Sequence, residues 1–481
     1  MSETTVCRWL PEDPALVDAY VHELLYTSRL IHGRHTETCE LVANVGEDLE
    51  TAIGKTGVGF DLSRVAHCYH FAADQKPAYK VRELHPVVKE FKEFIEAEGV
   101  VYAAFNKMFE QAPKPDNDQQ RKITNYVELM EAIDTNLATA PTYRPGPSAM
   151  VAGVPFYGII ARFCNTNAGY EAFTHPGVNQ RFHSVFTTWH GYLTSSASTN
   201  VIHDKEGGWL STVALNAMVQ SAGGNPEQQT FDNFYICDTS DPHYGFKSYD
   251  ELFIRELKEI HRAVVLPDNL SIVNSACSST VHKLYYDLKE TDQFWIKKTP
   301  YSLSHILAND ERTKYFVGGT LLQAMLGSLD YHRWRSPVKG TVVKTRLISG
   351  ATHPNPPPTY YAACLDNDHK DLDVVSRSQD FVTAISTRAL IFIEADGPVG
   401  LMCFVGVGLG EVSTCNIVVK EGDKLEKGDE LGQFHFGGST HCLIFGPGVP
   451  VSPIQQEDEN PPLVGKKVRV GKDILRLGCF P

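Results

Sequence analysis

The sequence predicts an α+β protein in which a helical amino-terminal part precedes a β-rich part. Apolar residues recur at spacings of three and four in the first half, whereas short β-branched and aromatic runs alternate with Gly, Pro and Asp after about residue 235. With 42% hydrophobic and 21% charged residues among 481, the chain has ample material for packed cores. We expect an amino-terminal segment over residues 1–40, a helical domain over 41–235 and a β-rich domain over 236–481.

The helical part is clearest from Pro86 to Gln111, where the apolar residues form one face of a predicted long helix. Proline suits a first helical turn, and the polar stretch APKPDNDQQ after Gln111 ends the pattern. The same reasoning predicts helices over Ala15–Leu30, Asn125–Ala138 and Val178–Leu193.

The β-rich part contains three clear strand candidates, Gly340–Leu347, Ala389–Ala395 and Leu401–Val407. Between the first two lies Thr352–Asp380, which is rich in Pro and Asp and is predicted to be a long surface loop. Loops of this length usually carry a function or are disordered.

Composition excludes several classes of protein. A net charge of −14 and a pI near 5.7 leave no basic field to bind nucleic acid. No uncharged apolar run approaches the roughly 20 residues that cross a bilayer, so we expect no integral membrane association. The start MSETTVCRWLPEDP lacks the features of a secretory signal, and the 11 cysteines form no CxxC pair. We therefore expect a reduced, cytoplasmic protein.

A chemically suggestive arrangement lies near the carboxyl end, where Gly437 and Gly438 precede Ser439 between two strand-like runs. The local sequence is typical of a β-hairpin with a two-residue turn. The same order also suits self-cleavage, because the Ser439 hydroxyl can attack the Gly438 carbonyl and form an ester. Elimination then converts the serine into a pyruvoyl group, and two glycines tolerate the strained turn beside the attacked carbonyl.

Four separated blocks resemble, in the same order, the phosphatidylserine decarboxylase family of pyruvoyl enzymes. The last block contains the cleavage motif, and the second contains a Tyr-His-Arg sequence. The four blocks are Tyr244–Lys258, Phe316–Gly340, Gly400–Cys415 and Gly432–Phe445.

The amino-terminal half is similar to a fungal branch of this family, which carries a helical extension and includes soluble tryptophan decarboxylases. The similar stretches are Pro86–Val101, Met150–Thr174 and Glu206–Ser211. This resemblance implies a helical domain followed by a phosphatidylserine-decarboxylase-like catalytic domain, and carboxy-lyase activity.

The resemblance also implies a covalent pyruvoyl cofactor derived from Ser439. Its ketone condenses with a substrate amine and accepts electrons as carbon dioxide leaves. His332, in the block YHRWRSP, falls where the family has a histidine implicated in decarboxylation, and we expect it to protonate the product. The alternative is a structural histidine in the core beside Tyr331 and Trp334.

Two positions depart from the family pattern. Arg335 stands where the family has a second histidine, and Ser278, in the run SACSS, stands where it has an aspartate. These family residues form with the serine a set that resembles a hydrolase triad. A guanidinium stays protonated and a hydroxyl carries no charge, so the ordinary maturation relay is absent.

Three outcomes follow from this departure. Another group activates Ser439, the candidate helpers being His435, His441 and His282, with Arg335 stabilising the oxyanion. Alternatively, the chain never cleaves and acts as a binding or regulatory paralogue. In the third case the fold uses Ser439 or Cys277 directly as a nucleophile.

For substrate, we expect a small-molecule amino acid, with an aromatic one such as tryptophan or tyrosine favoured. Tyr360 and Tyr361 on the long loop are candidate contacts to its ring. The alternative substrate is the lipid phosphatidylserine, but no basic or apolar interfacial helix is evident. The two fragments made by self-cleavage are expected to stay associated, and the sequence leaves the oligomeric state open.

Two further motifs suggest other functions. Glu421–Gly432 resembles strands of a lipoyl or biotinyl carrier domain but lacks the displayed lysine. Histidines and cysteines near the amino end have spacings that could bind zinc, namely His32, His35, Cys39, His67, Cys68 and His70. Pyruvoyl chemistry needs no metal, so we predict none.

Overall fold

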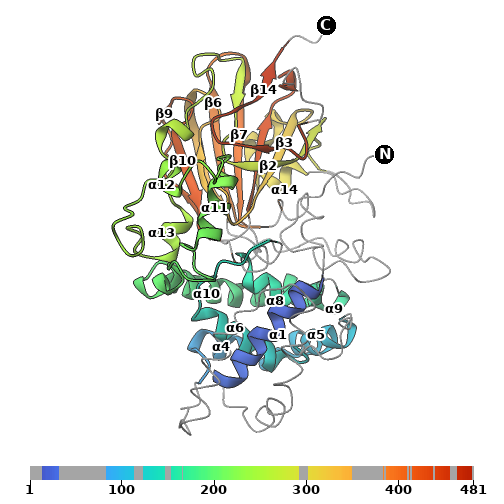
Figure 1. Cartoon of the computed structure of the whole chain (residues 1–481). Coiled ribbons are helices and arrows are strands. Elements are labelled where there is room, and N and C mark those ends of the chain that lie inside the picture. The colour runs from blue at the N-terminus through green and yellow to red at the C-terminus, as the bar shows by residue number, and fades with distance from the viewer. Residues whose placement is uncertain are drawn as a thin grey trace.

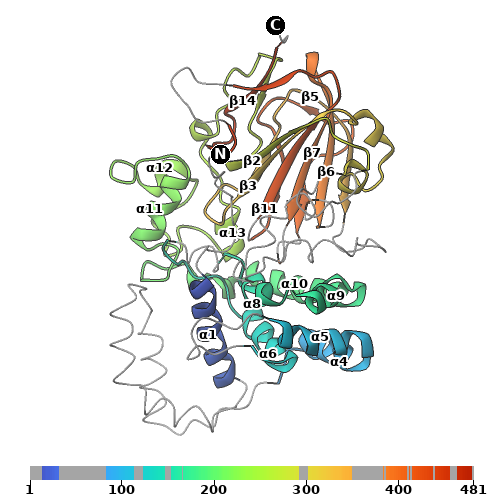
Figure 2. The ribbon, with the colours of Figure 1, turned by 90° about the vertical axis from the view of Figure 1, so that its right-hand side faces the viewer.

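The fold is a layer of helices beneath a sheet-rich region (Figure 1). The computed structural model describes the residue ranges given at the end of this paragraph, and every structural statement below refers to them. Figure 2 shows the ends of β11, β7 and β6 directed toward the layer that contains α8, α9 and α10. The described residues are 14–31, 83–112, 123–146, 153–164, 166–291, 302–348, 383, 386–408, 411, 414–436, 439–454 and 463–478.

Helices dominate the first half of the described chain, as predicted. Asn125 caps α6 because its side chain accepts a hydrogen bond from the Glu128 amide, and Pro86 opens α4. The predicted helices Ala15–Leu30, Asn125–Ala138 and Val178–Leu193 are confirmed as α1, α6 and α10. The α-helices are α1 (Pro14–Ile31), α4 (Pro86–Ala97), α5 (Gly99–Gln111), α6 (Tyr126–Leu137), α8 (Pro155–Cys164), α9 (Asn167–Thr174), α10 (Pro176–Leu193), α11 (Thr212–Ser221), α12 (Phe231–Phe234), α13 (Tyr249–Phe253) and α14 (Leu303–Ile306).

The single long helix predicted from Pro86 to Gln111 is wrong, because the chain forms two helices there. Glu98 ends α4 and precedes α5 with an extended backbone, at φ −99° and ψ 100°. The two helices pack against each other, and the rings of Phe91 and Phe105 meet edge to face at 6.2 Å. The apolar spacing continues across the break, so periodicity alone does not reveal it.

The β-rich part contains an eight-stranded antiparallel sheet and two sheets of three strands, of orders β1-β14-β12 and β4-β10-β8. The predicted strands are confirmed as β5, β6 and β7, and with them the α+β fold class. The large sheet has the order β13-β2-β3-β11-β7-β6-β5-β9. The strands are β1 (Ile272–Asn274), β2 (Ser279–Tyr286), β3 (Thr320–Leu326), β4 (Arg333–Arg335), β5 (Gly340–Ile348), β6 (Arg388–Ala395), β7 (Gly400–Gly408), β8 (Cys415–Ile417), β9 (Lys424–Leu425), β10 (Glu430–Phe434), β11 (Ser439–Phe445), β12 (Val451–Pro453), β13 (Lys467–Val468) and β14 (Asp473–Leu477).

The β-hairpin predicted around Gly437 and Gly438 is also wrong. Strand β10 pairs with β4 and β8, whereas β11 pairs with β3 and β7 in the large sheet. The chain therefore crosses from one sheet to the other between Phe434 and Ser439. Each strand is placed by partners distant in sequence, which the local residues do not encode.

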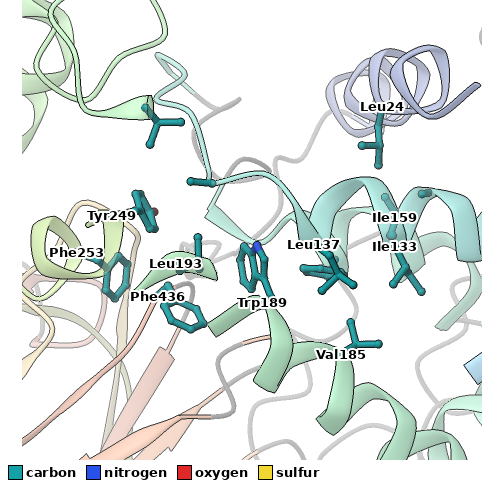
Figure 3. Close-up of a cluster of buried hydrophobic side chains, with 14 of the residues drawn as sticks. Leu24, Ile133, Leu137, Ile159, Val185, Trp189, Leu193, Tyr249, Phe253 and Phe436 are labelled. Atoms are coloured by element: carbon teal, nitrogen blue, oxygen red, sulfur yellow. The ribbon is translucent and has the colours of Figure 1, made fainter. Parts of the chain in front are cut away.

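The helical layer and the sheets share one hydrophobic cluster. It contains Trp189 of α10 and Phe253 of α13, and also Phe436, which follows β10. Figure 3 shows Phe436 beside Trp189, with Tyr249 and Phe253 close by. The packing thus brings the segment that precedes Ser439 into direct contact with the helices.

The domain limits stay predictions. The limit at residues 40 and 41 lies outside the described residues. Helix α12 lies just before the predicted limit at residues 235 and 236, and α13 lies after it. Both helices contribute to the shared hydrophobic cluster, so this cluster spans the predicted limit. Within the described ranges, no helix combines the length and hydropathy needed to cross a membrane.

Candidate active site

Ser439 is the first residue of β11, an interior strand of the large sheet. It pairs with Leu326 of β3 and Gly408 of β7. Side chains alternate along a strand, so Ser439 and His441 share one face while Thr440 points to the other. Ser439 is completely buried, and its Oγ has no hydrogen-bond partner among the described residues. Such groups are rare in folded proteins and are expected where a residue reacts.

His332 lies between β3 and β4 and is also completely buried. Its carbonyl accepts a hydrogen bond of 3.0 Å from the Phe434 amide, which ties it to the end of β10. Its ring stacks on Phe253 with centroids 4.0 Å apart, and neither ring nitrogen has a partner in the described part of the chain. Burial lowers the pKa of His332 to about 3, although the Asp330 carboxylate opposes this shift.

The loop before His332 is held by a buried polar cluster around Asp330. This carboxylate accepts hydrogen bonds from the Ser221 hydroxyl and the Gly327 amide, at 2.7 and 2.8 Å, and pairs with the ammonium group of Lys467. Arg255 donates to the Leu329 carbonyl at 2.6 Å. These contacts join α11, the α13 region and β13 to the loop, and so fix the backbone that carries His332.

Arg335 is engaged in ion pairs on β4. Its Nη2 lies 3.1 Å from Glu256, 3.3 Å from Glu430 and 3.1 Å from the Tyr331 hydroxyl. Its Nε is buried with no partner in the described ranges. The guanidinium cannot accept a proton, so Arg335 does not replace the expected histidine as a base, and its role toward an oxyanion stays a prediction.

Ser278 has a structural contact at the position where an aspartate was expected. Its Oγ accepts a hydrogen bond of 3.2 Å from the Val470 amide, which joins β2 to the segment after β13. The neighbouring Cys277 is completely buried, and burial raises the pKa of its thiol well above the usual range. A thiolate nucleophile at Cys277 is therefore disfavoured.

His435 lies in the crossing segment, which we define as the residues between Phe434 and Ser439, and its ring contacts a carboxylate. Its Nδ1 lies 2.9 and 3.0 Å from the two carboxylate oxygens of Asp250, on α13. Phe253, three residues further along this helix, stacks on His332. Residues three apart lie on the same helix face, so a single turn of α13 holds both histidines.

The remaining candidate helpers differ in their surroundings. His441 is buried beside Phe404, its two ring nitrogens have no partner among the described residues, and burial lowers its pKa to about 3. His282 lies at the bulge of β2, which β3 separates from β11. His435 and His332 are thus brought together, whereas His282 lies apart from them in the sheet.

Sequence reasoning missed Asp250, although it lies in the matched block Tyr244–Lys258. The signal was an acidic residue in the first turn of a short helix. Its partner His435 is 185 positions away, so no local pattern joins the two.

Helix α10 contacts the crossing segment directly. Phe436 packs edge to face on Trp189 with centroids 5.2 Å apart, and its backbone has a φ of 30°. His190 lies next to it, 5.6 Å from the ring of His435. A positive φ is uncommon for a residue with a side chain of this size, so the packing holds the backbone of Phe436 in a strained conformation.

Several predicted site residues lie outside the described residues. These are Gly438, Tyr360 and Tyr361, and also the histidines and cysteines considered for zinc. Among the described residues, no group of three or more His, Cys, Asp or Glu side chains is arranged to hold a metal.

Glu411, between β7 and β8, links the sheet to the helical layer. Its carboxylate accepts hydrogen bonds from the amides of Phe156 and Tyr157, at 3.0 and 3.3 Å, in the first turn of α8. Burial raises its pKa from 4.5 to about 7, although these amide donors oppose the shift. The loop that leaves Gly408, the strand partner of Ser439, is thereby anchored on a helix.

Glu411 should make stability depend on pH. Between pH 4.5 and about 7 the folded chain holds a proton that the unfolded chain releases, so the free energy of unfolding falls as the pH rises. The shift corresponds to about 3 kcal/mol, present below pH 4.5 and lost above pH 7. Glu411→Gln should remove this contribution in urea titrations at pH 5 and pH 8. Glu110→Gln, at an exposed site, should keep the wild-type difference.

Comparisons with known proteins agree on one family. Two family models described as phosphatidylserine decarboxylase match residues 85–218 and 249–476. A protein named decarboxylase iboD, from Amanita muscaria, is 41% identical over 338 residues, which cover 68% of this chain and 91% of the relative. An L-tryptophan decarboxylase from Psilocybe cubensis is 38% identical over 365 residues, covering 74% and 79%. The protein of the same name from Psilocybe cyanescens is 37% identical over 380 residues, covering 77% and 82%.

Proposed function

Because the chain belongs to the phosphatidylserine decarboxylase family of carboxy-lyases, we propose that it is a pyruvoyl-dependent decarboxylase of a free amino acid, with a prosthetic group made from Ser439. The observation that carries this proposal is the buried Ser439 hydroxyl, which has no partner among the described residues. A buried polar atom left unpaired costs about 1–3 kcal/mol. Ser439 also directly follows Gly438 in the matched cleavage block, and these two features together support a reaction at its hydroxyl.

The prosthetic group would form by self-cleavage. The Ser439 Oγ bonds to the Gly438 carbonyl carbon as the peptide C–N bond breaks, which leaves an ester and a free amine. Elimination across Cα and Cβ of residue 439 then breaks the Cβ–Oγ bond and frees the Gly438 carboxylate. Water adds and ammonia leaves, so that a ketone remains at residue 439. The positive φ of Phe436, two residues before Gly438, supports this proposal because it places backbone strain near the bond that breaks.

The surroundings of Ser439 suit such a group. A pyruvoyl group supplies a ketone that condenses with an amine and takes up the electrons released when carbon dioxide departs. Leu326 and Gly408 flank Ser439 on the neighbouring strands, and the aromatic rings of Trp334 and Phe404 lie on the same side of the sheet as His441. These apolar neighbours exclude water from the position where the ketone would lie.

His332 would handle the proton of the decarboxylation step, although not as the resident acid that the sequence suggested. With a pKa of about 3, its ring is neutral at physiological pH in the uncleaved chain. A substrate carboxylate brought beside the ring would raise the pKa, since an opposite charge favours the protonated form. Protonation of His332 would thus accompany substrate binding.

The proposed substrate is an aromatic amino acid, tryptophan or tyrosine. Support comes from two relatives that are named L-tryptophan decarboxylase and are 38% and 37% identical to this chain. Tyr360 and Tyr361 stay predicted contacts to the substrate ring. Phosphatidylserine, after which the family is named, is the alternative substrate.

The two fragments should remain associated after cleavage. Residues 439–481 would form the small chain, which contributes β11, β12, β13 and β14. Strand β11 pairs with β3 on one side and β7 on the other along its whole length. Separation would break both ladders and expose Leu443 and Phe445, which are buried in the core.

Denaturing mass spectrometry of the purified full-length protein tests this function. We expect two chains, the smaller starting at residue 439 and gaining the mass of an added amine after treatment with that amine and borohydride. Carbon dioxide release should be faster with tryptophan or tyrosine than with phosphatidylserine vesicles.

A single intact chain without a reactive ketone would instead favour a non-processing paralogue. The ion pairs of Arg335 and the amide contact of Ser278 are the observations that favour this second candidate, because both residues are engaged elsewhere.

A further inference from the structure

Self-cleavage requires a group that takes a proton from the Ser439 hydroxyl and gives one to the departing nitrogen. Arg335 cannot accept a proton, and Ser278 carries no charge with which to orient a base. Histidine is the side chain best suited to this exchange, and His332, His441, His435 and His190 are the candidates in the described part of the chain.

Of these four, only His435 has a carboxylate hydrogen-bonded to its ring within the described structure. Both oxygens of Asp250 lie within 3.0 Å of Nδ1, so the carboxylate holds the N–H on this nitrogen and leaves Nε2 as the proton acceptor. Asp250 also stabilises the imidazolium that forms when Nε2 takes a proton. His332 and His441 are buried with neither ring nitrogen paired, and burial works against their protonation.

The two sheets are joined beside the crossing segment. Phe434 of β10 pairs with Cys415 of β8, the Cys415 Sγ lies 3.7 Å from the Gly406 carbonyl of β7, and Gly406 pairs with His441 of β11. The end of β10 is therefore linked to β11 through two intermediate strands, β8 and β7.

The backbone of His435 is held close to the links between β10 and β11. Its amide donates to the Thr414 carbonyl at 3.2 Å. Thr414 ends the connection that begins after Gly408, the strand partner of Ser439. Only three residues separate His435 from Ser439, and the ring of Phe436, the first of them, packs on Trp189.

We propose that His435, oriented by Asp250, is the proton carrier of self-cleavage. Nε2 takes the Ser439 Oγ proton as Oγ bonds to the Gly438 carbonyl carbon, and returns it to the Ser439 nitrogen as the C–N bond breaks. The step is redox-neutral and needs no co-reactant. This inference rests on the proposed function, in which Ser439 is the residue that cleaves.

The test is the rate of self-cleavage of full-length chains made by cell-free translation, followed by denaturing electrophoresis and intact mass. His435→Gln should slow cleavage by about 10²–10⁴-fold, the usual contribution of general acid–base catalysis. Asp250→Asn, which keeps the shape of the side chain but not its charge, should also slow it. In His435→Gly, added imidazole should restore part of the rate, a response that a purely structural role would not give.

The matched control is His243→Gln. The His243 ring is likewise held through Nδ1, at 2.7 Å, but its partner is the Ile202 carbonyl and not a carboxylate. The His243→Gln chain should cleave at the wild-type rate. Wild-type cleavage in His435→Gln overturns the inference and leaves the proposed function standing, whereas a wild-type chain that never cleaves overturns the function itself. If His435→Gln does not fold, Asp250→Asn decides, and an unchanged rate there overturns the inference.

Discussion

Alanine in place of Ser439 should leave the chain in one piece and reduce carbon dioxide release to background. The substitution removes one buried oxygen that has no hydrogen-bond partner in the described structure, so folding should be preserved or slightly improved. Intact mass and a thermal melt of the same sample measure both effects. No other group can take the place of this oxygen, because the ester needs a hydroxyl on the residue after the broken bond.

Ser279→Ala is the matched control for this experiment. Ser279 begins β2 in the same sheet, and its Oγ is likewise completely buried and unpaired within the described ranges. The control variant should cleave like the wild type, since Ser279 does not border the bond that breaks. Cleavage of the Ser439→Ala chain between residues 438 and 439 would exclude Ser439 as the nucleophile.

Replacement of His332 by asparagine should give a protein that self-cleaves but releases carbon dioxide about 10²–10⁴-fold more slowly, as expected when a general acid–base group is lost. The ring is stacked on Phe253, unpaired and uncharged, so its removal leaves no unpaired charge and only a small cavity. Single-turnover release of carbon dioxide from the matured protein, normalised to its ketone content, separates this effect from incomplete maturation.

His261→Asn provides the control for a lost ring contact. His261 stacks on Phe234 at 4.1 Å and 25°, nearly the geometry of His332 on Phe253 at 4.0 Å and 27°. It lies outside the candidate site, so turnover should be unchanged. Full turnover in His332→Asn would remove this histidine from the mechanism.

The site was only partly predictable, as His332 and Arg335 illustrate. Both were located from the Tyr-His-Arg block, and the departure at Arg335 was visible in the sequence. The engagement of Arg335 with Glu256 and Glu430 was not, because those carboxylates come from other parts of the chain. The neutrality of His332 was hidden for a similar reason, since burial is a property of the packed core.

What the sequence alone determined was local: the helices α1, α6 and α10, the strands β5 to β7, the order of the matched blocks and the Gly-Ser bond. These features depend on periodicity and on residues that are close together in the sequence, so they can be inferred without the tertiary structure. Only the tertiary structure decided the break at Glu98, the passage between two sheets before Ser439 and the pairing of His435 with Asp250. Each of these depends on contacts between distant segments, and the free energy of burying such contacts outweighs local preference.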